Sequence, residues 1–104
     1  MAYTIVFTPE AQEQLVKLYQ YIAKTASPSI AERYTNSIIE YCEDLETFPE
    51  RSTMRGDIRP GLRITNYRKR TVIAYTIEVE TVVILGLFYG GQDFETSLQD
   101  NLDS

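Results

Sequence analysis

The chain has 104 residues, of which 43% are hydrophobic and 24% are charged, and its formal net charge is −5. This length and composition predict one folded domain with a single core and exclude a disordered or fibrous protein. The sequence has no histidine and one cysteine, Cys42, which excludes an internal disulfide and the usual histidine-paired nucleophiles. We therefore expect no metal and no other cofactor.

Nothing in the sequence indicates a membrane protein. The longest uncharged apolar run, Thr81 to Tyr89, is less than half of the roughly 20 residues that a membrane-spanning helix needs. The chain opens at Met1 directly into a predicted strand, without the pattern of a signal peptide. We expect a cytoplasmic protein without a membrane partner.

The N-terminal half is typical of one strand followed by two helices. Residues Ala2 to Phe7 are rich in β-branched and aromatic side chains, and Tyr3, Ile5 and Phe7 fall on one face at period two, which predicts a strand. A helix start follows at Thr8-Pro9-Glu10, where a hydroxyl N-cap, a proline and an acid all favour the first turn. A second start comes at Ser27-Pro28, and its apolar repeat continues to Pro49. Because few residues separate the two helices, we expect an antiparallel hairpin.

Three strands are expected in the C-terminal half. Residues 49–61 include two prolines and two glycines and have no sustained period, which predicts a loop with room for a short helical turn. Leu62 to Tyr67 alternates between two faces, whereas Arg70 to Ile77 and Thr81 to Phe88 are apolar on both faces and should be central strands. Glu78-Val79-Glu80 lacks Gly and Asn, a weak hairpin signal, but its spacing fits an antiparallel pair.

These elements predict an α+β domain over residues 1–104. Their order is β-α-α-β-β-β, with the helical hairpin packed on one face of an antiparallel sheet. The polar C-terminal tail, about residues 92–104, follows the last strand, and Phe94 and Leu98 stand four residues apart near its start. This spacing suggests one or two turns of helix in the tail.

Positive charge is concentrated in residues 51–70, which hold seven of the ten Lys and Arg residues and one acid, Asp57. This segment carries +6 and the other 84 residues carry −11. One interpretation is that its arginines pair with Glu50 or with acids of the second helix, in exposed pairs worth about 0 to 1 kcal/mol each. Those acids are Glu40, Glu43, Asp44 and Glu46.

The other interpretation is a positive surface for an anionic partner, because arginine binds carboxylates and phosphates through a planar fork of donors. A sequence pI near 4.6 favours a protein partner over free nucleic acid, so we expect no direct sequence-specific nucleic-acid binding. Most of the eight tyrosines should pack in the core, with two of them at the surface. The candidate partner-binding residues are Arg51, Arg55, Arg59, Arg63, Tyr67, Arg68, Lys69, Arg70 and Tyr89.

Four stretches, taken in order, resemble the ParE branch of the RelE/ParE toxins of bacterial type II toxin-antitoxin modules. They are YTIVFTPEAQEQLVKLYQYIA, ASPSIAERY, FPERSTMRGDIRPGLR and VVILGLFYGGQDFE, and the resemblance covers about residues 3–95. It implies a two-helix hairpin on a curved antiparallel sheet. It also implies a cognate antitoxin that wraps the toxin, a possible higher-order toxin-antitoxin complex and, for ParE-like members, inhibition of DNA gyrase and replication.

The superfamily also contains ribosome-dependent mRNA endonucleases, so that activity is an alternative. Attack of a 2′-hydroxyl on the adjacent phosphate needs a proton acceptor, a proton donor and positive charge. Tyr89 resembles a tyrosine that these relatives use, Arg63 could supply charge, and Glu50 could act as base if the fold brings it to Tyr89. An unperturbed phenol with a pKa of about 10 is a poor base, and no histidine is present. We therefore expect a gyrase-directed inhibitor rather than an enzyme, with the endonuclease and a toxin-fold protein with another or degenerate target as alternatives.

Overall fold

The computed structural model describes residues 3–50, 52–90, 94 and 98. Its elements follow the predicted order with a 3-10 helix and a short strand added after the second helix, and the α+β class is confirmed. They are β1 (Thr4–Phe7), α1 (Pro9–Thr25), α2 (Pro28–Glu43), the 3-10 helix η1 (Asp44–Glu46), β2 (Thr53–Met54), β3 (Arg63–Tyr67), β4 (Thr71–Glu78) and β5 (Thr81–Tyr89).

Both helices begin where the sequence predicts. The Thr8 hydroxyl accepts a hydrogen bond from the Ala11 amide at 3.1 Å, and the Ser27 hydroxyl accepts one from Ile30 at 3.2 Å. The second helix was expected to run to Pro49, but α2 ends at Glu43 and η1 replaces its last turn. The tighter turn buries Leu45 and directs the Glu46 carbonyl to the Tyr3 amide, 2.9 Å away, which ties the end of the helical hairpin to β1.

The sheet is mixed, which corrects the expected antiparallel sheet. Its strand order is β1-β5-β4-β3-β2, and β1 runs parallel to β5 while the other neighbours are antiparallel. β1 and β5 are joined through both helices and the other strands, so no tight turn forces them to be antiparallel. β2 is a second correction, because residues 49–61 were expected to form a loop and Thr53–Met54 instead pairs with the start of β3.

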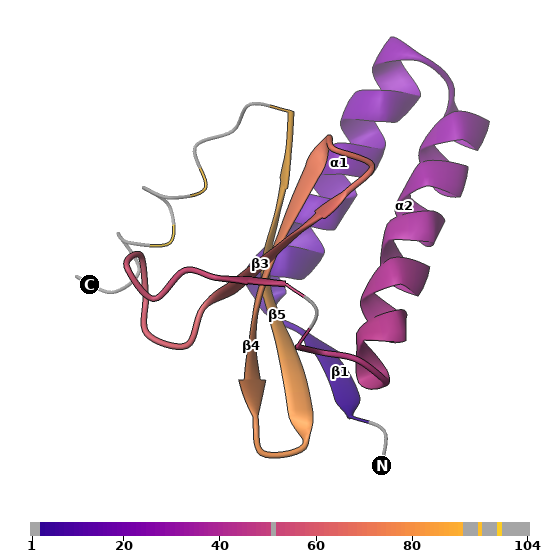
Figure 1. Ribbon diagram of the computed structural model, residues 1–104. Coiled ribbons are helices and arrows are strands. Elements are labelled where there is room, and N and C mark those ends of the chain that lie inside the picture. The colour runs from indigo at the N-terminus through magenta and orange to yellow at the C-terminus, as the bar shows by residue number, and fades with distance from the viewer. Residues whose placement is uncertain (1–2, 51, 91–93, 95–97, 99–104) are drawn as a thin grey trace.

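Both faces of the central strands, β4 and β5, are packed against other parts of the protein, as the apolar residues on both of their faces predict. The helices pack on one face, over Ile73, Tyr75 and Ile84. Figure 1 shows both helices on that side, while the segment after α2 crosses to the other side. There Ile58 and Leu62 pack against Ala74, Phe88 and the described tail residue Leu98 in a second cluster.

Several smaller expectations have clear outcomes. The sequence left open whether Cys42 lies in the core or where the helices pack, and it is fully buried within the core cluster. Phe94 packs beside Phe88, with ring centroids 6.1 Å apart, and the remainder of the predicted tail helix lies outside the described residues. Neither helix in the described part of the chain has the length and apolar character needed to cross a membrane.

Candidate partner-binding surface

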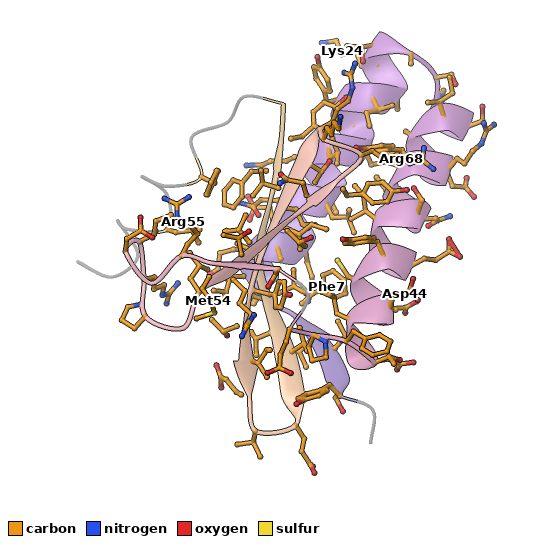
Figure 2. The ribbon with its side chains drawn as sticks, viewed as in Figure 1. Phe7, Lys24, Asp44, Met54, Arg55 and Arg68 are labelled. Atoms are coloured by element: carbon orange, nitrogen blue, oxygen red, sulfur yellow. The ribbon has the colours of Figure 1, made fainter. Side chains whose placement is uncertain are left out.

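The structure divides the basic stretch into two groups. The loop group, Arg55, Arg59 and Arg63, lies on the segment before β3 and at the first residue of that strand, and the turn group, Arg68, Lys69 and Arg70, forms the β3–β4 turn. The two ends of β3 are roughly 13 Å apart. Figure 2 shows Arg55 and Arg68 on different sides of the molecule, with Arg68 toward α2. Arg51 lies outside the described residues.

Two members of the loop group are engaged within the protein. Arg55 donates from Nε and Nη2 to the two carboxylate oxygens of Asp57, at 3.0 and 2.9 Å. This hydrogen bonding holds the pKa of Asp57 below its ordinary value. Arg63 donates from Nη1 to the Glu50 carbonyl at 3.2 Å and to the Ser52 hydroxyl at 3.3 Å. Among the described residues, no ion pair joins the basic stretch to the acids of α2 or to the Glu50 carboxylate.

The turn group is exposed on a strained backbone. Arg68 and Lys69 have φ angles of 53° and 63°, in the left-handed region that Gly and Asn favour. For other L-residues this region costs roughly 1–2 kcal/mol each. The Arg70 amide donates to the Tyr67 carbonyl at 3.2 Å, and the Gly90 amide donates to the Arg70 carbonyl at 2.8 Å. The turn is therefore joined to the end of β5, and its three basic side chains face solvent.

Tyr67 supports the turn from within the protein, which corrects its expected place at the surface. It is 9% exposed, and its ring lies 5.3 Å from that of Tyr41 and 5.8 Å from that of Tyr34. Arg68 Cζ lies 5.2 Å from the centre of the Tyr67 ring, within the range of a cation–π contact. Tyr67 can therefore orient Arg68 but offers little surface of its own to a partner.

The tyrosine contacts continue from Tyr34 to Tyr89 and from Tyr89 to Tyr21, with centroid distances of 5.9 and 6.1 Å. The Tyr34 and Thr71 hydroxyls share a hydrogen bond of 2.8 Å, and those of Tyr41 and Thr65 share one of 3.0 Å. Burial raises the pKa of the Tyr34 phenol. That phenol is therefore neutral at physiological pH and serves as a structural contact rather than as a base.

An open cleft of about 450 Å³ adjoins the turn group at the end of β5. Gln14, on α1, lines the cleft and accepts a hydrogen bond from the Leu87 amide at 2.7 Å, beyond the residues of β5 that pair with β1. Tyr21, which is 56% exposed, lines the cleft and was missed from sequence. The sequence does carry a signal for this face, because Gln14, Lys17 and Tyr21 follow one another at steps of three and four residues and so share one side of α1. The lining residues are Gln14, Lys17, Leu18, Tyr21, Leu87, Tyr89 and Gly90.

The fold does not bring together the three residues expected for an endonuclease. The strand register places Tyr67, Thr71 and Tyr89 level with one another, at the end of β3 away from Arg63. Tyr89 and Arg63 are thus separated at the backbone by roughly 13 Å along the strands and about 10 Å across them. Glu50 stays with Arg63 through the bond to its carbonyl. In the described part of the chain, no cluster of acidic or cysteine side chains could hold a metal ion.

Two solved structures are similar to this fold. The chromosomal ParDE TA system from P. aeruginosa aligns with a TM-score of 0.75 and 17% identity, covering 86% of this chain and 97% of that one. The toxin-antitoxin complex RelBE2 from Mycobacterium tuberculosis aligns with a TM-score of 0.63 and 24% identity, covering 86% and 99%. No curated protein is similar enough to count as a match.

The sequence also matches a protein family, and that family, like the two similar structures, belongs to toxin-antitoxin systems. Residues 5–94 match the family described as ParE toxin of type II toxin-antitoxin system, parDE. The matched segment contains both helices, β2 to β5, all of β1 except Thr4, and both basic groups. Because the match extends over most of the sequence, the chain belongs to the ParE toxin family of type II toxin-antitoxin systems.

Proposed function

We propose that this protein is a toxin that inhibits DNA gyrase and is neutralised by a cognate antitoxin. The observation that carries the proposal is the family match over residues 5–94, together with the resemblance of the chain to ParE-like toxins. The ParDE system of P. aeruginosa and the RelBE2 complex, which share the fold, are themselves toxin-antitoxin assemblies, which supports an antitoxin partner here.

The separation of Tyr89 from Arg63 and Glu50 supports an inhibitor over a nuclease. General acid-base catalysis needs its groups within hydrogen-bond reach of one substrate, and these three residues lie in two places on the sheet. An inhibitor needs only a complementary surface. The proposed role of the protein is therefore to bind its target rather than to carry out chemistry on it.

In this proposal the basic groups are the working surface. Arg59 and the turn group would contact a negatively charged partner, Arg51 and Arg63 would extend that contact, and Tyr89 would lie at its edge. An antitoxin would set its acids against these bases and bury an amphipathic helix or a strand beside them. Arg55 is the member least suited to this role, because Asp57 already engages its guanidinium.

Two assays with the purified protein separate the candidate targets. In a gyrase supercoiling assay, we expect loss of supercoiling and accumulation of cleaved DNA. In a translating ribosome assay, we expect intact message. Cut message with unaffected gyrase would contradict the proposal and support the endonuclease, and growth unaffected by expression without antitoxin would contradict a toxin of either kind.

A charge-reversal variant tests the surface. Replacing Arg59 and Lys69 by Glu should abolish gyrase inhibition and weaken antitoxin binding, because both side chains lie outside the core. Arg33→Glu, on the exposed side of α2, is the matched control and should retain both properties. If the two variants inhibited gyrase and bound antitoxin equally well, the basic groups would not belong to the working surface.

A further inference from the structure

The β3–β4 turn carries side chains that its backbone conformation does not favour. Its two central residues, Arg68 and Lys69, have left-handed φ angles although neither is Gly or Asn. Strained backbone of this kind persists where the surrounding structure holds it, and it concentrates at functional sites. Bulky basic side chains at these positions destabilise the turn relative to Gly or Asn. Their presence is therefore best explained by what they contact.

The turn is also held in one orientation before any partner arrives. Tyr67 is wedged between Tyr34 and Tyr41, whose hydroxyls are in turn bonded to Thr71 and Thr65. Arg68 lies over the face of that fixed ring. A guanidinium restrained in this way loses less side-chain freedom on binding than a free one.

From these contacts we propose that Arg68-Lys69-Arg70 is a preformed docking element for an acidic peptide segment of a partner protein, and that Tyr67 is its positioning residue. The cleft beside the turn, joined to it by the bond from Gly90 to Arg70, would receive one apolar side chain of the same segment. This inference deepens the proposed function and rests on it for the charge of the partner.

The charge around the turn favours a peptide over nucleic acid. The chain as a whole carries −5, and exposed acids, Glu32, Glu40 and Glu43, lie along α2, toward which the turn points. A nucleic acid longer than the turn would bring further phosphates against those acids. A short peptide can contact the turn and the cleft without reaching them.

The test begins with a displayed library of random dodecapeptides selected on the immobilised wild-type protein. We expect enrichment of peptides that combine several acidic residues with one large apolar residue. The best peptide, labelled with fluorescein, is then measured by anisotropy at physiological ionic strength. A labelled single-stranded DNA of similar charge should bind more weakly.

Variants that keep the charge provide the discriminating measurement. Arg68→Lys preserves the charge but loses the planar contact with Tyr67, and it should weaken peptide binding roughly five- to tenfold. Tyr67→Leu should weaken binding similarly without changing any charge. Tyr67→Phe keeps the ring and should bind as the wild type does, as should Arg33→Gln, which removes an exposed charge on α2.

Three results would overturn the inference: enriched peptides without acidic residues, equal binding by Arg68→Lys and Arg33→Gln, or tighter binding of the DNA. Because Arg68 is exposed, its variant should keep the thermal unfolding profile of the wild type even if Tyr67→Leu does not fold. The measurement needs no gyrase. Failure of the wild-type protein to inhibit gyrase would therefore overturn the proposed target and leave the docking element standing.

Discussion

Gly86, on β5, has no room for a larger side chain. A Cβ built there would lie 2.7 Å from Phe88 Cε2 and 3.2 Å from Gln14 Oε1. Gly86→Ala should therefore lower the free energy of unfolding by about 1–3 kcal/mol, because Phe88 must leave its packed position. Urea denaturation measures this difference. Gly56→Ala, which meets nothing within 4 Å, is the control, and an equal loss in both variants would contradict the steric explanation.

Val79, in the β4–β5 turn, is 94% exposed and has a φ of 47°. A β-branched side chain is poorly suited to this left-handed conformation, whereas Asn tolerates it. Val79→Asn should raise the free energy of unfolding by about 0.5–1 kcal/mol without affecting any contact in the core. In the same denaturation experiment Val79→Ala should gain less than Val79→Asn. An unchanged Val79→Asn variant would show that no strain is relieved.

Cys42 should make stability fall in alkali. Burial raises the pKa of its thiol to about 12, above the ordinary value of 9.0. As pH rises from about 9 toward 12, the unfolded chain loses this proton while the folded chain keeps it, so the free energy of unfolding falls by at most about 1.4 kcal/mol per pH unit. Cys42→Ala lacks this contribution and is the reference in denaturation at each pH. If the free energies of unfolding of the two proteins changed with pH in the same way, the thiol would not be buried and neutral in the folded protein.

Among the helices and strands, the features that depend on residues close together in the chain were predicted correctly from the sequence. The Thr8 and Ser27 caps mark both helix starts, and the two-sided apolar pattern of β4 and β5 predicts their central positions. The parallel direction of β1 could not be predicted in this way, because it depends on a partner about 80 residues away along the chain. β2 was missed because a pair of residues is too short to show a period.

The contact between α1 and β5 is another feature that the sequence pattern did not reveal. Gln14→Ala removes the acceptor for the Leu87 amide, so it should lower the free energy of unfolding by about 1–2 kcal/mol and speed hydrogen exchange at that amide. Gln20→Ala, at an exposed site on the same helix, is the matched control. Exchange at Leu87 that does not change would indicate that Gln14 does not protect this edge of β5.

At the scale of the molecule, the uneven distribution of charge was predictable and its spatial division was not. Counting charged residues along the sequence located the positive segment. The register of β3 is what places the loop group and the turn group at opposite ends of that strand. The contacts in the folded protein are what distinguish Arg55, which pairs with Asp57, from the exposed turn. Tyr67 was misplaced for the same reason, since its burial depends on α2 packing over the end of β3.

This charge separation should govern how fast a partner binds. An acidic antitoxin segment of the kind proposed above would be steered toward the basic turn by long-range attraction, which salt screens over about 8–10 Å. Raising the salt concentration from low to several times physiological should slow association with the cognate antitoxin roughly tenfold and change dissociation much less, as measured by stopped-flow fluorescence. Lys69→Glu should reduce the salt dependence, whereas Arg33→Glu should preserve more of it. An association rate indifferent to salt would mean that the apolar cleft, rather than the basic turn, guides the encounter.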